Sequence, residues 1–278
     1  MAESEPSNMP KQGPARIEML DAIRGFALFG ILLMNLEAFN GPILGAIGGI
    51  DSGLQGLDYW TDALIYIFVQ GKFWTLFSLL FGIGFAVMVE GARVAGTDFE
   101  AFYRRRLFFL MLIGLAHLWL IWEGDILFSY ALAGFVLLGW YRSGSNFGLP
   151  GIVAWYCAPL LLLAGIGILS GTDPKADGHF DKELAEQVRI FGSGTYADVV
   201  RWRIGKFGQD LASMLFLLPM TVAMFALGVR FYRQGLAKPP VSADPAISRS
   251  GALIWCCGLL LMLLSVWIVP EINPTRTD

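Results

Sequence analysis

Repeated apolar runs close to the ~20 residues that cross a bilayer are the feature that most restricts the fold of this chain. Inside a membrane every backbone N–H and C=O group needs a partner within the protein, and a helix meets that demand by itself. Of the 278 residues, 55% are hydrophobic and 15% are charged, whereas about a quarter of the residues in a soluble domain are charged. We therefore predict an all-α fold, a polytopic transmembrane helix bundle within a lipid bilayer.

The apolar runs predict about seven spans, with boundaries uncertain by a few residues. The predicted spans are Ala22–Phe39, Trp74–Glu90, Arg106–Trp122, Ile126–Trp140, Gly151–Ser170, Leu211–Val229 and Gly251–Val269. A shorter apolar and aromatic segment, Leu57–Gln70, ends at Gln70-Gly71-Lys72. Because such polar groups are costly in lipid, we expect an interfacial or re-entrant helix there, with a separate span as the alternative.

Outside the spans, the sequence predicts two polar segments. Residues 1–15 are rich in Pro, Ser and Glu and lack an apolar period, so we expect a disordered cytoplasmic tail. The transmembrane domain then covers residues 16–278 and includes an external segment at residues 171–210.

The distribution of Lys and Arg predicts the orientation in the membrane, because cytoplasmic loops retain basic residues. Alternate connections carry the basic residues Lys11, Arg16, Arg93, Arg104, Arg105, Arg106, Arg142, Arg230, Arg233, Lys238 and Arg249. The opposite short connections, residues 40–56 and 123–125, carry none. The exception is the longer segment 171–210 on that side, which carries Lys175, Lys182, Arg189, Arg201, Arg203 and Lys206. We therefore expect a multi-pass protein of the plasma (inner) membrane with a cytoplasmic N-terminus.

Composition and motifs argue against several classes of protein. The net charge is −3, and the basic residues lie in short clusters between apolar runs, so nucleic acid is not an expected partner. The three cysteines, Cys157, Cys256 and Cys257, lie within apolar runs without a CxxC pair, and no spacing of ligands predicts a metal site.

Three polar residues form a stripe along the first predicted span. Asp21 and Arg24 are three positions apart and share a helix face, and Asn35 lies almost in line with Arg24. One interpretation is a salt-bridged anchor at the membrane surface plus an amide that packs against a neighbouring helix. The functional alternative is that Asp21, Arg24 and Asn35 bind a substrate along a water-filled path.

His117 is the main candidate for a catalytic residue. It lies near the end of its predicted span, and Glu123 and Asp125 follow just beyond that end. A carboxylate beside an imidazole can fix its tautomer and stabilise the imidazolium, the minimum for a general base. We expect His117, Asp125 and Lys72 to border one catalytic cavity, with Glu123 binding substrate. The alternatives are a packing histidine and a lysine that extends to the membrane surface.

The order and spacing of three segments resemble the YeiB-like family of bacterial integral membrane proteins. The segments are Arg16–Gly25 leading into Gly30–Asn35, then Gly71–Gly82, and Arg105–Leu107 through Gly114–His117 to Gly124–Leu127. The resemblance implies kinship with transmembrane acyltransferases, which acetylate sugars outside the cytoplasm. It also implies that the chain lacks the C-terminal helices of the family. In related lysosomal enzymes the histidine follows the first helix, but residues 40–56 contain none.

Three functions remain open from the sequence. The leading hypothesis is acyl transfer from a cytoplasmic thioester donor such as acetyl-CoA to an external glycan or lipid-linked acceptor. A transporter or permease for a small or lipid-linked molecule is the second, because proline residues interrupt two predicted spans. A non-catalytic membrane subunit is the third, and homo-oligomerisation is compatible with all of them.

Reporter fusions test the predicted topology. Fusions after Trp122 and Gly171 should report the external side, and fusions after Gly96 and Arg233 the cytoplasm, because the basic residues stay inside. Activity of paired periplasmic and cytoplasmic reporters gives the measurement. A cytoplasmic signal after Gly171 would reverse the second half of the map.

Overall fold

The computed structural model describes residues 18–40, 43, 50, 53–144, 148–170 and 179–236. Within these ranges the chain forms helices and no strand, which confirms the all-α prediction. The helices are α1 (Glu18–Asn40), α3 (Gly56–Phe68), α4 (Lys72–Ala95), α5 (Phe99–Ala116), α6 (Leu127–Arg142), α7 (Leu149–Ser170), α8 (His179–Ser193) and α9 (Tyr196–Arg233). A π-helical turn, η1 (His117–Ile121), extends α5.

Four helical segments among the described residues have the length and apolar composition needed to cross a bilayer. They are Glu18–Leu36, Gly56–Ala95, Leu149–Ile166 and Tyr196–Arg233. α5 carries three consecutive arginines and α6 has only 16 residues, so neither reaches that standard alone. These four segments indicate a membrane protein. The count of seven spans stays a prediction.

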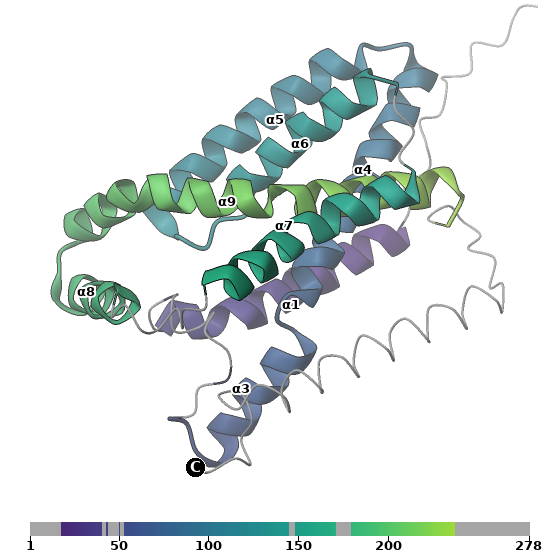
Figure 1. The fold of residues 1–278 in the computed structure, drawn as a ribbon. Coiled ribbons are helices and arrows are strands. Elements are labelled where there is room, and N and C mark those ends of the chain that lie inside the picture. Colours follow the sequence, from purple (N-terminus) through teal and green to yellow (C-terminus); the bar gives the residue numbers. More distant parts are fainter. Residues whose placement is uncertain are drawn as a thin grey trace, which may run out of the picture.

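Helix α4 lies at the centre of the bundle, where α9 crosses it (Figure 1). The two helices approach closely because two glycines meet at the crossing. A Cβ atom on Gly82 would overlap the Phe225 carbonyl, and one on Gly228 would overlap the Leu79 carbonyl. Beside this crossing the rings of Phe81 and Phe225 stack with centroids 4.5 Å apart. Backbone contact and stacked rings therefore hold the core together.

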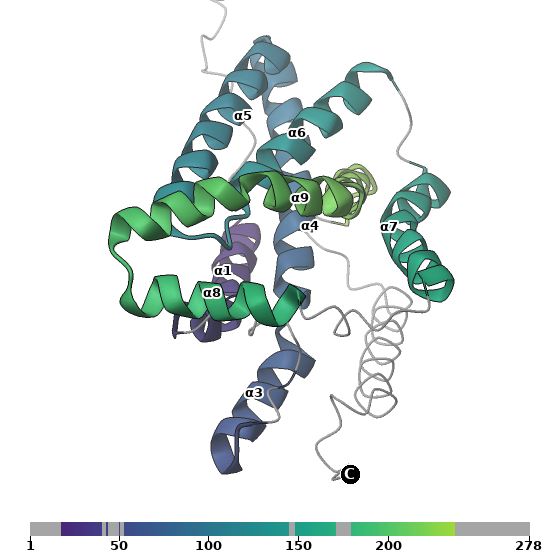
Figure 2. The ribbon, with the colours of Figure 1, turned by 60° about the vertical axis from the view of Figure 1, so that its left-hand side comes forward.

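Helices α5 and α6 form an antiparallel pair beside α4 (Figure 2). Leu107 fills the space left by Gly134, and Gly114 lies against the backbone of Phe128. Tyr130 of α6 connects the pair to α4 through a hydrogen bond of 2.6 Å with the Ser78 hydroxyl. This bond pairs two polar groups that are fully buried in the core.

The outer helices expose apolar surfaces whose contact with water is unfavourable. Helix α1 packs on α4, and α7 lies along α9. Large apolar side chains remain exposed on the outer faces of α1, α5 and α7. They include Phe29, Leu36, Phe109, Ile113, Leu161 and Leu163. An exposed apolar surface of this extent is expected of helices that face lipid.

The bundle has two chemically different ends. At one end Arg142 forms an ion pair of 3.1 Å with Glu100, and the Tyr232 hydroxyl donates to Glu90. We call this the arginine-rich end. It holds Arg93, Arg104, Arg105, Arg106, Arg142, Arg230 and Arg233. The opposite end, which we call the His117 end, comprises η1, the connection Trp122–Ile126, α8 and the first turns of α9.

The structure describes two further predicted segments. Helix α9 is continuous from Tyr196, whereas the sequence predicted a span that begins at Leu211. The segment Leu57–Gln70 contains α3, which a tight turn at Gly71 (φ 75°) separates from α4. The predicted tail, residues 1–15, and the last predicted span, Gly251–Val269, lie outside the described residues.

Substitution of Gly82 tests the helix crossing. Gly82→Ala should lower the free energy of unfolding by about 1–3 kcal/mol, because an added methyl group overpacks a backbone contact. Gly139→Ala is the control, since a Cβ there has no atom within 4 Å. Unfolding in detergent, followed by tryptophan fluorescence, measures both. Equal stability of the two variants would contradict the crossing.

Candidate functional site

A π-helical turn places His117 at one end of the bundle. The N–H of Trp122 donates to the His117 carbonyl over 2.8 Å, a bond that spans one residue more than an α-helical bond. Such turns inside helices occur frequently at functional sites. Here the wide turn ends the helix and leads into the short connection that carries Glu123 and Asp125.

His117 and Asp125 form a hydrogen-bonded pair. Nδ1 of His117 lies 2.9 Å from Oδ1 of Asp125, and Oδ2 of Asp125 accepts the N–H of Phe128 over 2.7 Å. The Asp125 side chain is fully buried and that of His117 is 30% exposed. A carboxylate that accepts from Nδ1 selects the tautomer in which Nε2 is the acceptor of the ring.

The surroundings of Asp125 act on its charge in opposite directions. Burial raises the pKa of the Asp125 carboxyl above its ordinary value, and the N–H groups of Phe128 and Leu127 and the neighbouring His117 oppose that rise. The interactions that oppose burial are those that favour the ionised form. They are also the contacts that fix the orientation of the carboxylate.

Glu123 links the connection to α8. Its carboxylate accepts a hydrogen bond from the Gln187 side chain. Burial raises the pKa of Glu123, and the positive charges of Lys206 and Arg203 oppose that rise. Lys206 itself forms an ion pair of 2.7 Å with Glu183. The predicted substrate-binding residue Glu123 therefore lies within a network between α8 and α9.

Several buried polar groups around this network lack a hydrogen-bond partner within the described part of the chain. Gln187 is fully buried with Oε1 unpaired, and Arg203, 7% exposed, has Nε unpaired and its guanidinium over the Phe191 ring. The unpaired indole N–H groups belong to Trp119, Trp122 and Trp202. Unpaired donors in a buried site cost free energy, so a bound polar ligand would offset that cost.

The other predicted site residues belong to α1 and α4. Asp21 and Arg24 form the predicted ion pair, 3.1 Å long, on α1. Asn35 is on the same helix, where its amide has no hydrogen bond among the described residues. Lys72 begins α4 and its ammonium donates to the Tyr66 carbonyl over 3.2 Å, which satisfies the last turn of α3. A cavity shared by Lys72 with His117 and Asp125 stays a prediction.

The sequence did not identify Gln187, Arg203 and Lys206 as neighbours of Glu123. The available signal was the amphipathic pattern of residues 179–193, which indicates a helix that lies against another surface. The described residues contain no group of three His, Cys, Asp or Glu side chains that would hold a metal ion.

Comparison with known proteins identifies three uncharacterised relatives, whereas no family model and no solved structure matches significantly. The protein YxaH of Bacillus subtilis (strain 168) is 32% identical over 268 residues, which cover 88% of this chain and 64% of YxaH. YeiB of Escherichia coli (strain K12) is 34% identical over 152 residues, 54% of this chain and 36% of YeiB. A 39.9 kDa protein in the amylase 3′ region of Bacillus acidopullulyticus is 35% identical over 127 residues, 46% of this chain and 34% of that protein.

The chain thus spans less than two thirds of the length of each of these relatives. The similarities are consistent with the YeiB-like resemblance of the sequence. Because each relative is named as uncharacterised, the comparison assigns no activity to the site.

The pH dependence of stability tests the burial of Glu123. Its pKa is raised above the ordinary value of 4.5 in the folded state, so its contribution is fully present below that pH and is lost as pH rises through the raised pKa. Arg203, Lys206, Asp210 and Gln187 surround the carboxyl and set the size of this loss. Glu123→Gln should lose less stability than the parent protein as pH rises from about 4.5 towards neutrality.

Glu186→Gln serves as the control because the pKa of Glu186 is shifted in the opposite direction, lowered by a hydrogen bond from Arg189. That variant should retain the loss of stability with rising pH. Thermal unfolding midpoints over a pH series give the measurement. The burial of Glu123 would be refuted by a Glu123→Gln curve parallel to that of the parent.

Proposed function

We propose that this chain is a membrane-bound acyltransferase in which His117 acts as the general base on an external acceptor. The observation that carries the proposal is the His117–Asp125 pair, in which a buried carboxylate holds Nδ1 of a partly exposed imidazole. Orientation of an imidazole by a fixed carboxylate is the arrangement by which enzymes activate hydroxyl groups.

The proposed reaction has one proton transfer at each stage. Nε2 of His117 takes the proton of the acceptor hydroxyl as its oxygen attacks the thioester carbonyl. When the C–S bond breaks, the imidazolium returns the proton to the departing thiolate. Asp125 stabilises the positive charge that the ring carries between these steps.

The surrounding polar groups support an acceptor rich in hydroxyl groups, such as a glycan or a lipid-linked sugar. The Nε–H of Arg203 and the indole N–H groups of Trp119 and Trp122 are buried donors without partners in the described structure, so an acceptor would reach them only after neighbouring side chains move. Glu123 provides an acceptor, and the half-buried rings of Trp119 and Trp122 provide apolar faces. Sugars present both hydroxyl groups and apolar C–H faces, so this mixture suits them.

The proposed orientation restricts the donor. The basic residues put the arginine-rich end in the cytoplasm, and the His117 end then lies outside. A cytoplasmic donor therefore needs a long, flexible arm that carries its acyl group towards His117. A thioester such as acetyl-CoA has this form, and it enters as a substrate of the reaction.

Radiolabelled acetyl-CoA tests the proposal. Membranes from cells that express the chain should transfer label to their lipid or polysaccharide fraction, and membranes from cells with an empty vector should not. His117→Ala should lower the transfer by roughly a hundredfold, as expected for loss of a general base. Asp125→Asn should also lose most of the activity because it no longer fixes the tautomer.

His179→Ala is the matched control, since it removes the other histidine of the chain. It should retain the transfer, and all variants should show the amount of folded protein found for the parent. Equal label with and without the chain would contradict acyl transfer. Parallel losses of folded protein and activity in His117→Ala would identify a packing histidine.

A further inference from the structure

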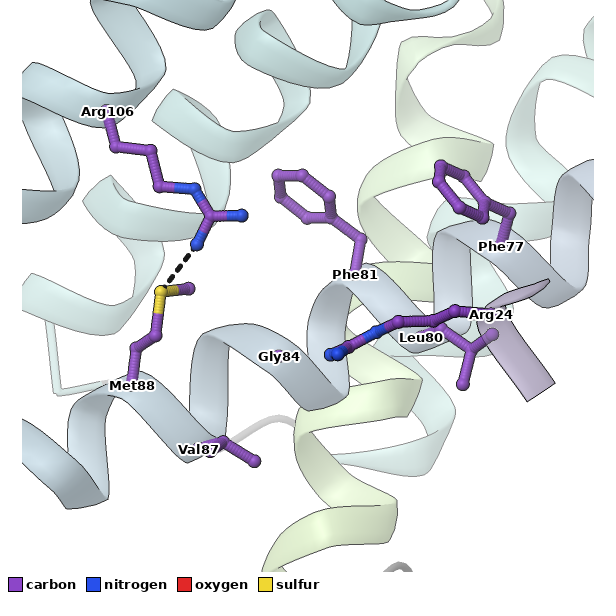
Figure 3. A pocket seen from close by; sticks show the side chains of 8 residues that line it. All are labelled: Arg24, Phe77, Leu80, Phe81, Gly84, Val87, Met88 and Arg106. Atoms are coloured by element: carbon purple, nitrogen blue, oxygen red, sulfur yellow. Dashed lines mark hydrogen bonds between the residues drawn. The ribbon is translucent and has the colours of Figure 1, made fainter. Parts of the chain in front are cut away.

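A cavity near the arginine-rich end lies away from the His117 site. Its volume is about 420 Å³. One guanidinium comes from Arg24 on α1 and the other from Arg106 on α5, with α4 between them. Figure 3 shows both groups directed towards the space above Gly84.

The two arginines differ in how their charges are compensated. Arg24 pairs with Asp21, whereas the hydrogen bond of Arg106 within the described residues goes to the Met88 sulfur. A thioether is a weak acceptor without charge, so it does not compensate a guanidinium. The cavity therefore has a net positive charge. Its several guanidinium N–H donors are suited to bind an anion.

The remaining surface of the cavity is apolar. Phe77, Leu80, Phe81 and Val87 of α4 contribute side chains to it. Gly84 leaves room for a guanidinium, because a Cβ at this position would lie 3.0 Å from Nη2 of Arg24. A ligand that fits has a negative head between the arginines and an apolar part against α4.

The positions of the walls favour a ligand that arrives from the bilayer. Exposed apolar side chains lie on both flanking helices, such as Phe26 on α1 and Phe109 on α5. A lipid has direct access along such surfaces and brings its own apolar chains. Arginine binds phosphate through two parallel hydrogen bonds, which gives it preference over other cations for this head group.

We propose that this cavity binds an anionic phospholipid, with its phosphate between Arg24 and Arg106 and an acyl chain along Phe77 and Phe81. The net charge of the cavity selects an anionic lipid over a zwitterionic one. This binding does not depend on acyl transfer, so its failure would leave the proposed function untouched.

Lipid retention tests the proposal. The purified chain is incorporated into nanodiscs that contain equal parts of phosphatidylglycerol and phosphatidylcholine, and native mass spectrometry measures the retained lipid. The parent protein should retain phosphatidylglycerol preferentially. Arg106→Gln should weaken this retention by about tenfold or more, as expected for loss of a charge-assisted hydrogen bond.

Arg105→Gln is the matched control, because it removes an adjacent exposed charge that does not line the cavity. It should retain the lipid as the parent does. Arg106→Lys keeps the charge without the planar fork and should be intermediate. Since Arg106 is exposed, these changes should leave the unfolding midpoint unchanged.

Two results would overturn the proposal. One is equal loss of phosphatidylglycerol in Arg105→Gln and Arg106→Gln, which would indicate only general attraction to a basic end. The other is displacement of the bound lipid by soluble acetyl-CoA at a concentration lower than the concentration of phosphatidylglycerol needed for the same displacement. That outcome would assign the cavity to a soluble phosphate-bearing ligand.

Discussion

The crossing of α4 and α9 at Gly82 and Gly228 determines where the functional groups lie. Lipid supplies no hydrophobic force between helices, so their association depends on close van der Waals packing, which small residues permit. Because α9 is one continuous helix, fixing its second half against α4 also fixes the direction of its first half. Arg203 and Lys206 reach the neighbourhood of Glu123 by that route, and Phe207 packs against Trp119 with ring centroids 5.4 Å apart.

The apolar runs were sufficient to predict most of the helices but not their full lengths. Trp74–Glu90 falls within α4, and the charged residues of this helix lie only towards its two ends. The first turns of α9 were not predicted as part of the span because Arg201, Arg203 and Lys206 lower the local hydropathy. Their compensation is tertiary: Lys206 pairs with Glu183, and the Arg203 guanidinium lies over the Phe191 ring. A window of sequence contains neither partner in the required position.

The same distinction applies to the candidate site. The short connection after His117 restricted Asp125 to its vicinity, which made the pair predictable from the sequence alone. The π-helical turn was not predictable, since it depends on where the next helix packs and not on residue type. Gln187 reaches Glu123 only because α8 folds back on α9, a long-range contact that local periodicity does not encode.

The asymmetry of the His117–Asp125 pair argues for a functional histidine. Both oxygens of Asp125 are engaged, one by the imidazole and one by the N–H of Phe128, so the carboxylate has a single orientation. Here Nε2 has no hydrogen bond within the described residues, and the ring is partly exposed. Rigid support on one nitrogen and access at the other is what proton transfer requires.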